Sequence, residues 1–97
     1  SVSSPATQRV RINGGVRYIN EVNARCGTIP GKGRTQINWH DEQMKFITAS
    51  IKVYKCSADW QLNRQIVIAP KNAAFAIVFG VSHTTIPIEI TRISLRR

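Results

Sequence analysis

The sequence predicts an all-β protein, an antiparallel β-sandwich or barrel of about seven strands. Short runs rich in β-branched and aromatic residues recur at intervals of about 8–14 residues, which is the spacing of such folds. Clusters of Gly, Pro, Asn and Asp separate these runs and are typical of turns. One segment, 39–47, also has a helical reading, and no other segment favours a helix.

Length and composition set the scale of the fold. The 97 residues, 42% of them apolar, suffice for one domain with one modest core. Residues 1–8 are small and polar with one proline, so we expect a flexible lead-in there and a single domain over 9–97. No apolar run approaches the ~20 residues of a membrane helix. The first residues lack the form of a signal peptide, so we expect that none exists or that it has been removed.

Turn signals delimit each expected strand. The expected strands are Arg9–Asn13, Val16–Cys26, Arg34–His40, Lys45–Cys56, Trp60–Ala69, Ala73–Val81 and Ile86–Leu95. Gly14–Gly15 predicts a tight hairpin turn and Gly27–Gly33 a loop. The turns after the third, fourth, fifth and sixth strands are expected at 41–43, 57–59, 70–72 and 82–85.

Period-two alternation assigns side chains to the two faces of each strand. The residues expected to point inward are Val16, Tyr18, Val22, Ala24, Thr35, Ile37, Trp39, Ile47, Ala49, Ile51, Val53, Trp60, Leu62, Ile66, Ile68, Phe75, Ile77, Phe79, Ile86, Ile88 and Ile90. Ile93 and Leu95 are out of phase with Ile90, which predicts a bulge near Thr91–Arg92. Pro87 has no N–H donor, so it should lie near the start of its strand or where the ladder is open.

The opposite face of two strands is lined with planar polar side chains. Such side chains offer forked hydrogen bonds to a hydroxyl-rich ligand. We therefore expect a ligand-binding set on two adjacent strands, namely Arg17, Glu21, Asn23, Arg25, Arg34, Gln36, Asn38 and His40. The alternative is an ordinary solvated outer face, which antiparallel sheets commonly have.

Two cysteines, Cys26 and Cys56, are the whole thiol content of the chain. Two thiols without CxxC spacing do not make a zinc site. They are compatible with one disulfide in a secreted chain, or with two small half-buried apolar residues in strands.

The few titratable residues do not suggest catalysis. The chain has two His, two Asp and three Glu, and the consecutive His40, Asp41 and Glu42 have diverging side chains. His83 has no recognisable acid partner, and no nucleophile-elbow, zinc-protease or nucleotide-binding motif occurs. We therefore expect no enzyme, no cofactor and no metal.

The charge is strongly positive, with 14 Lys and Arg against 5 Asp and Glu, for a net +9. Nine of the cations are arginine, which suits bidentate pairing with carboxylate or phosphate. Possible partners are nucleic acid, acidic surface polysaccharides or an acidic neighbouring subunit. Because the seven aromatic residues mostly occupy expected inward positions, nucleic acid is the weaker of these expectations.

A series of short motifs runs in a familiar order through residues 10–95. They are Gly14-Gly15-x-x-Tyr18, Ile37-x-Trp39-x-Asp41, Trp60, Ala69-Pro70-x-Asn72-Ala73 and Ile88-x-Ile90-x-x-Ile93-Ser94-Leu95. This order resembles the β-jelly-roll carbohydrate-binding-like (galactose-binding-like) modules of glycoside hydrolases, phage tail fibres and tailspikes. The family often has an acidic calcium ligand where this chain has Thr91–Arg92, so the resemblance does not imply calcium here.

The resemblance implies a non-catalytic module for glycan binding, or for receptor binding and trimerisation. It also implies a location at the C-terminal tip of a phage tail fibre or tailspike, or otherwise outside the cell, and a homotrimer. Three alternatives remain open at this point: an assembly module that meets an acidic partner, a basic nucleic-acid-binding β domain, and the receptor-binding subunit of a secreted toxin. The last would require an oxidised Cys26–Cys56 pair.

Overall fold

The computed structural model describes residues 6–28, 31–84 and 86–97 and contains seven strands. Their bounds are β1 Ala6–Arg11, β2 Arg17–Cys26, β3 Gly31–His40, β4 Phe46–Cys56, β5 Gln61–Ile68, β6 Phe75–Ser82 and β7 Ile88–Arg96. Each predicted strand is found. β1 begins at Ala6, within the expected lead-in, and the rest of that lead-in lies outside the described residues.

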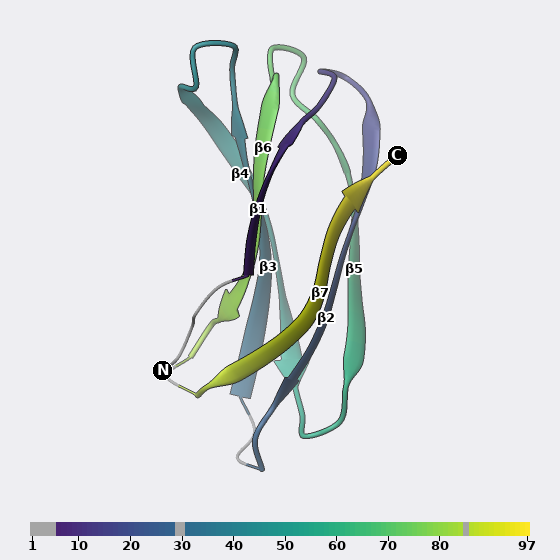
Figure 1. Cartoon of the computed structure of the whole chain (residues 1–97), viewed down its shortest axis with the longest axis vertical. Coiled ribbons are helices and arrows are strands. Elements are labelled where there is room, and N and C mark those ends of the chain that lie inside the picture. Colours follow the sequence, from purple (N-terminus) through teal and green to yellow (C-terminus); the bar gives the residue numbers. More distant parts are fainter. Residues whose placement is uncertain (1–5, 29–30, 85) are drawn as a thin grey trace.

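The strands form two antiparallel sheets packed face to face, so the predicted β-sandwich is confirmed (Figure 1). Sheet A has the order β1-β6-β3-β4 and sheet B the order β5-β2-β7. The extents of 41 × 22 × 17 Å give an elongated block whose long axis follows the strands. The helical reading of 39–47 is wrong: Trp39 and His40 end β3, and the Asp41 carboxylate accepts hydrogen bonds from the backbone N–H groups of Gln43 and Lys45 in the following turn.

The hairpin expected at Gly14–Gly15 is also wrong. The turn is present, with Gly15 at φ 77°, but it passes the chain from β1 in sheet A to β2 in sheet B. The backbone N–H of Gly15 donates to the Ala69 carbonyl, and that of Ile12 donates to the Ala74 carbonyl. These bonds hold the β1–β2 connection against the β5–β6 connection, whereas in a hairpin β1 and β2 would pair with each other.

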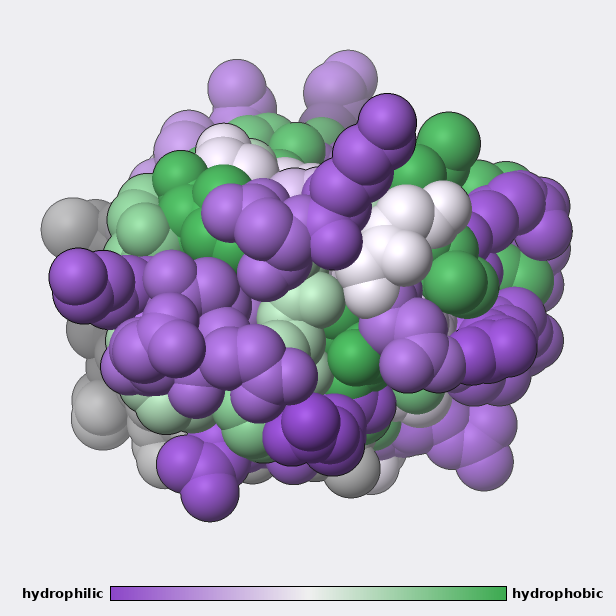
Figure 2. Space-filling view, turned by 90° about the horizontal axis from the view of Figure 1, so that it is seen from above, coloured by the Kyte–Doolittle hydropathy of each residue, from purple (hydrophilic) through white to green (hydrophobic). Residues whose placement is uncertain are grey.

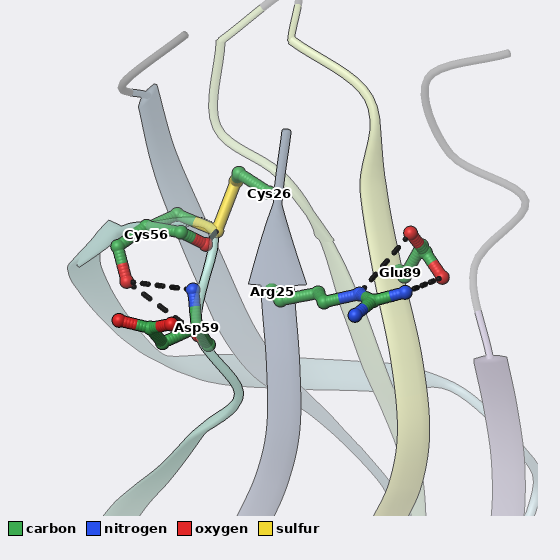
Figure 3. Close-up of polar contacts among 6 residues, drawn as sticks. Arg25, Cys26, Cys56, Asp59 and Glu89 are labelled. Carbon is green, nitrogen blue, oxygen red and sulfur yellow. Dashed lines mark hydrogen bonds and ion pairs between the residues drawn. A yellow bond between two sulfur atoms is a disulfide. The ribbon is translucent and has the colours of Figure 1, made fainter. Parts of the chain in front are cut away.

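The core consists of two apolar clusters. The first contains Ile12, Tyr18, Ile37, Trp39, Ala69, Ala73, Ala76 and Val78. The second contains Val22, Ala24, Cys26, Tyr54 and Cys56. Cys26 and Cys56 form a disulfide with Cα atoms 5.5 Å apart, which joins the end of β2 in sheet B to the end of β4 in sheet A (Figure 3).

Polar side chains connect the two sheets through the interior. Gln65 Nε2 of β5 donates to Asn20 Oδ1 of β2 at 3.0 Å and to Thr35 Oγ1 of β3 at 3.1 Å. Two further buried bonds lie within one sheet: Asn20 Nδ2 donates to the Ser94 carbonyl of β7 in sheet B, and Trp39 Nε1 donates to Ser50 Oγ of β4 in sheet A. Asn20 and Thr35 are completely buried, so these bonds supply partners that water cannot.

In β4, β5 and β6, the face that points into the core is the opposite of the one expected. The expected inward residues Ala49, Ile51, Val53, Leu62, Ile66, Ile68, Phe75, Ile77 and Phe79 lie on the outer faces, and Trp60 is also exposed. In β6 the buried residues are Ala76, Val78 and Gly80. The reason is space: a Cβ on Gly80 would lie 2.6 Å from Ile90 Cδ1 of the facing sheet, so small residues must point inward there.

The bulge predicted near Thr91–Arg92 is confirmed. Asn23 pairs with Arg92 and Ala24 with Ile90, which leaves Thr91 as the extra residue. The shift lets Ile90 and Ile93 both pack against the core. Pro87 directly precedes β7, as its missing donor requires.

Candidate ligand-binding face

The structure separates the eight predicted binding residues into two groups. Arg34, Gln36, Asn38 and His40 lie on the outer face of sheet A, here called the A face. Arg17, Glu21, Asn23 and Arg25 lie on the outer face of sheet B, the B face. The expectation that their two strands are adjacent is wrong, because β3 and β2 are central strands of different sheets.

On the B face, three of the four predicted residues already have internal partners. Glu21 accepts hydrogen bonds from Arg64 at 2.7 Å and from Arg96 at 3.2 Å. The hydrogen bond from Arg64 is the main cause of the lowered pKa of Glu21, and partial desolvation opposes it. Arg25 pairs with Glu89 (Figure 3) and lies over the Trp60 ring at 4.7 Å.

Asn23 completes this arrangement, because its Nδ2 donates to Thr91 Oγ1 at the bulge. These contacts use the forked groups that a ligand would need. Glu21, Asn23 and Arg25 therefore have structural roles within sheet B, whereas Arg17 has no side-chain partner among the described residues.

On the A face, polar and apolar side chains form parallel rows. The polar row runs along β3, between outward residues of β6 on one side and of β4 on the other. Gln36 pairs with Phe79 and Ile51, and Asn38 pairs with Ile77 and Ala49. In the same way, Arg34 pairs with Val81 and Val53, and His40 pairs with Phe75 and Phe46.

The amides of the polar row are hydrogen-bonded to each other. Gln36 Nε2 donates to Asn38 Oδ1 at 2.8 Å. Gln36 Oε1 and Asn38 Nδ2 have no other side-chain partner among the described residues. The pair therefore offers one acceptor and one donor in a fixed orientation.

His40 closes the row at one end. Its Nδ1 lies 3.2 Å from the Met44 carbonyl, which can only accept, so the ring proton belongs on Nδ1. Its Nε2 is covered by neighbouring atoms and has no hydrogen-bond partner among the described residues. The ring lies edge-on to Phe46, with centroids 5.9 Å apart.

The sequence did not predict that aromatic side chains lie on this face. Of the seven aromatic residues only Tyr18, Trp39 and Tyr54 are buried, so the expectation that most point inward is wrong. Phe46 is 57% exposed, and Phe75 and Phe79 are half-buried. The signal that could have revealed them is the small residues Ala74, Ala76 and Gly80, which alternate with the Phe residues and fit a narrow core.

Apolar residues also reach the surface on other elements. Figure 2, which looks onto one end of the molecule, shows apolar residues at the surface between hydrophilic ones. Leu62, Ile66 and Ile68 of β5 are 54–70% exposed on the B face.

Within the described part of the chain, no group of three His, Cys, Asp or Glu side chains could hold a metal ion. The same residues contain no helix that is long and apolar enough to cross a membrane.

The architecture is that of a carbohydrate-binding-module-like β-jelly-roll. Similar solved structures include the CBM22-1–GH10 modules of the Clostridium thermocellum endo-1,4-β-D-xylanase 10B complexed with xylohexaose. That match has a TM-score of 0.75 and 16% identity, and it covers 92% of this chain and 19% of that one. A CBM4 structure matches with a TM-score of 0.71 and 17% identity over 95% of this chain and 59% of the other.

The enzymatically active domain of bacteriophage CBA120 tailspike protein 4 is similar to the same degree. Its TM-score is 0.71 at 18% identity, over 95% of this chain and 13% of that one. The chain thus spans less than two thirds of the length of each of these three structures. No protein-family model matches the sequence, and no curated protein matches it.

Proposed function

We propose that this chain is a non-catalytic glycan-binding module whose ligand lies along β3 on the A face. The observation behind this proposal is the row Arg34-Gln36-Asn38-His40, which is flanked on both sides by apolar and aromatic side chains. Saccharides present hydroxyl groups at their edges and C–H groups on their ring faces. A polar row between apolar rows matches both surfaces of a sugar ring.

The amides, the phenylalanines and Arg11 have distinct roles in this proposal. The hydrogen bond between the two amides uses Gln36 Nε2 and Asn38 Oδ1 and fixes their orientation. Gln36 Oε1 therefore accepts a hydrogen bond from a sugar hydroxyl, and Asn38 Nδ2 donates one. Phe75 and Phe79 contact the ring faces. Arg11 lies 4.9 Å over Phe75 and is paired with Glu42, so it supports the aromatic ring from the edge strand.

Binding is favoured over hydrolysis by the positions of the carboxylates. Glycosidases normally place two carboxyl groups on opposite sides of the scissile bond. Near the A face the carboxylates are those of Asp41 and Glu42, in the β3–β4 turn. The first accepts backbone N–H bonds and the second pairs with Arg11, so both have structural partners.

The test is a glycan array probed with the wild-type chain and with two variants. Arg34→Ala combined with Asn38→Ala should abolish binding. Asn23→Ala, which truncates on the B face the same residue type as Asn38→Ala, should retain it. Binding that survives the double substitution rules out the A-face site, and loss with Asn23→Ala alone would move the site to the B face.

A second role is assembly into a homotrimer at the tip of a phage tail fibre or tailspike. The similarity to a tailspike domain and the exposed Leu62, Ile66 and Ile68 of β5 favour this role. Both roles place the chain on a virion tail or outside the cell. Sedimentation of the wild type and of Ile66→Ser/Ile68→Ser tests assembly: a trimer that the double variant loses supports it, and a monomeric wild type contradicts it.

A further inference from the structure

Both outer faces carry cations without an ion pair, but only at one end of the A face do three of them lie close together. On the B face, Arg64 and Arg96 pair with Glu21 and Arg25 pairs with Glu89, whereas Arg17 and Arg92 have no ion pair among the described residues and lie far apart along β2. On the A face, the ion pair of Arg11 with Glu42 lies at the end near the β3–β4 turn. Among the described residues, no carboxylate lies within ion-pair distance of the cations at the other end, which are Lys32, Arg34 and Lys55.

Two of these cations stand directly opposite each other. Lys32 of β3 and Lys55 of β4 are register partners, and both are exposed. Like charges in this position destabilise a sheet unless something neutralises them. The two lysines also border a hollow of about 610 Å³, which Gly31, Ser57, Gln61 and Thr84 help to line.

Arg34 occupies the next outward position of β3. Its Nε is buried and has no hydrogen-bond partner among the described residues. Its strand neighbours on the face are Val53 and Val81, which cannot accept a hydrogen bond from it. A guanidinium without an internal acceptor suits a carboxylate or sulfate group, which it can bind with two parallel hydrogen bonds.

From this arrangement we infer that the glycan bound on the A face is acidic. Its carboxylate or sulfate groups pair with Lys32, Lys55 and Arg34, and its neutral part lies on Gln36 and Asn38. The inference rests on the proposed function and names its ligand class. A glycan fits better than nucleic acid because three of the cations cluster at one end, whereas Gln36 and Asn38 in the middle of the row are neutral. Arg9, which also has no ion pair among the described residues, lies apart from this cluster on β1, beside Ile77.

The experiment measures binding of the chain to polygalacturonate, dextran sulfate, neutral xylan and single-stranded DNA by isothermal titration calorimetry. The variants are Lys32→Gln/Lys55→Gln and Arg34→Gln. The matched control is Lys71→Gln/Arg92→Gln, which removes the same charge as the first variant from exposed positions away from the A face. Circular dichroism verifies that each variant is folded.

We expect the wild type to bind an acidic polymer at least about tenfold more tightly than xylan, and more weakly as salt rises. Both A-face variants should lose this preference, and the control should keep it. Equal loss in the control overturns the inference, because the binding is then non-specific. DNA binding that exceeds acidic-glycan binding and depends on the same residues also overturns it.

The remaining outcomes separate this inference from the proposed function. Binding to xylan with no preference for acidic polymers overturns the inference and leaves the glycan-binding proposal standing. The absence of binding to every glycan on the array and in calorimetry contradicts both.

Discussion

Tyr54 of β4 lies directly over Gly33 of β3, its register partner, and any side chain on Gly33 would overlap the phenol ring. The ring fills the space that the missing side chain leaves, an arrangement known to stabilise glycine in sheets. The loop predicted over Gly27–Gly33 is wrong for its last three residues, because β3 begins at Gly31 and Gly33 pairs with Tyr54. The contact also buries Tyr54 beside the disulfide, in the second core cluster.

Gly33→Ala should therefore destabilise the fold by about 1–3 kcal/mol, the usual cost of overpacking a core. Gly27→Ala is the matched control, since a Cβ there would meet open space. Urea unfolding measures both. Equal stabilities for the two variants would show that the ring does not constrain Gly33.

The Tyr54 hydroxyl is buried without a hydrogen-bond partner among the described residues, and burial raises its pKa to about 12. In the unfolded chain tyrosine titrates near its ordinary value of about 10. The unfolded state therefore loses its proton first, and stability should fall as pH rises from about 10 to about 12.

Tyr54→Phe should remove this alkaline loss and should not reduce stability at neutral pH, because it deletes an unsatisfied group. Tyr18→Phe is the contrast, since the Tyr18 hydroxyl accepts a hydrogen bond from the Asn13 N–H at 2.8 Å. It should cost about 1 kcal/mol. Thermal unfolding at several pH values measures both effects. If the Tyr54→Phe variant loses as much stability at alkaline pH as the wild type, Tyr54 is not the cause of that loss.

Gln65 links the two sheets through the core, so Gln65→Leu should destabilise the protein by about 1–3 kcal/mol by leaving Asn20 and Thr35 without that donor. Gln61→Leu, an exposed position four residues earlier on β5, should have little effect. Denaturant unfolding compares the two. A stabilised Gln65→Leu variant would mean that an apolar interior is preferred here.

The Cys26–Cys56 bond closes a loop with a sequence separation of 30 residues. In the chain-entropy description its loss should cost about 3–4 kcal/mol. Cys26→Ala/Cys56→Ala and the reduced wild type should show the same lowered midpoint in urea. If the reductant leaves the midpoint of the wild type unchanged, the bond is absent or does not stabilise the fold.

Local patterns predicted much of this molecule. Turn residues marked the seven strands, and the phase change between Ile90 and Ile93 located the bulge at Thr91. The polar row on β3 was also evident from alternation in 34–40. In each case the information lies within a few consecutive residues, where backbone geometry alone decides the outcome.

Local patterns predicted which residues of the candidate site are polar, but not which of them lie together on one sheet. Asn23 and Asn38 look alike in sequence, since each alternates with apolar neighbours. Only the strand order shows that Asn23 bonds to Thr91 in one sheet, whereas Asn38 lies between Ile77 and Ala49 in the other.

The sequence by itself determined the seven strands, the bulge and the inward faces of β2 and β3. In β4, β5 and β6, only the tertiary structure decided which face lies inside. Alternation is symmetric between inside and outside when both sets contain apolar residues, as in β6 with Phe75 and Phe79 on one side and Ala76 and Val78 on the other. The choice depends on the volume left by the opposite sheet, where Ile90 leaves no room for a side chain at Gly80.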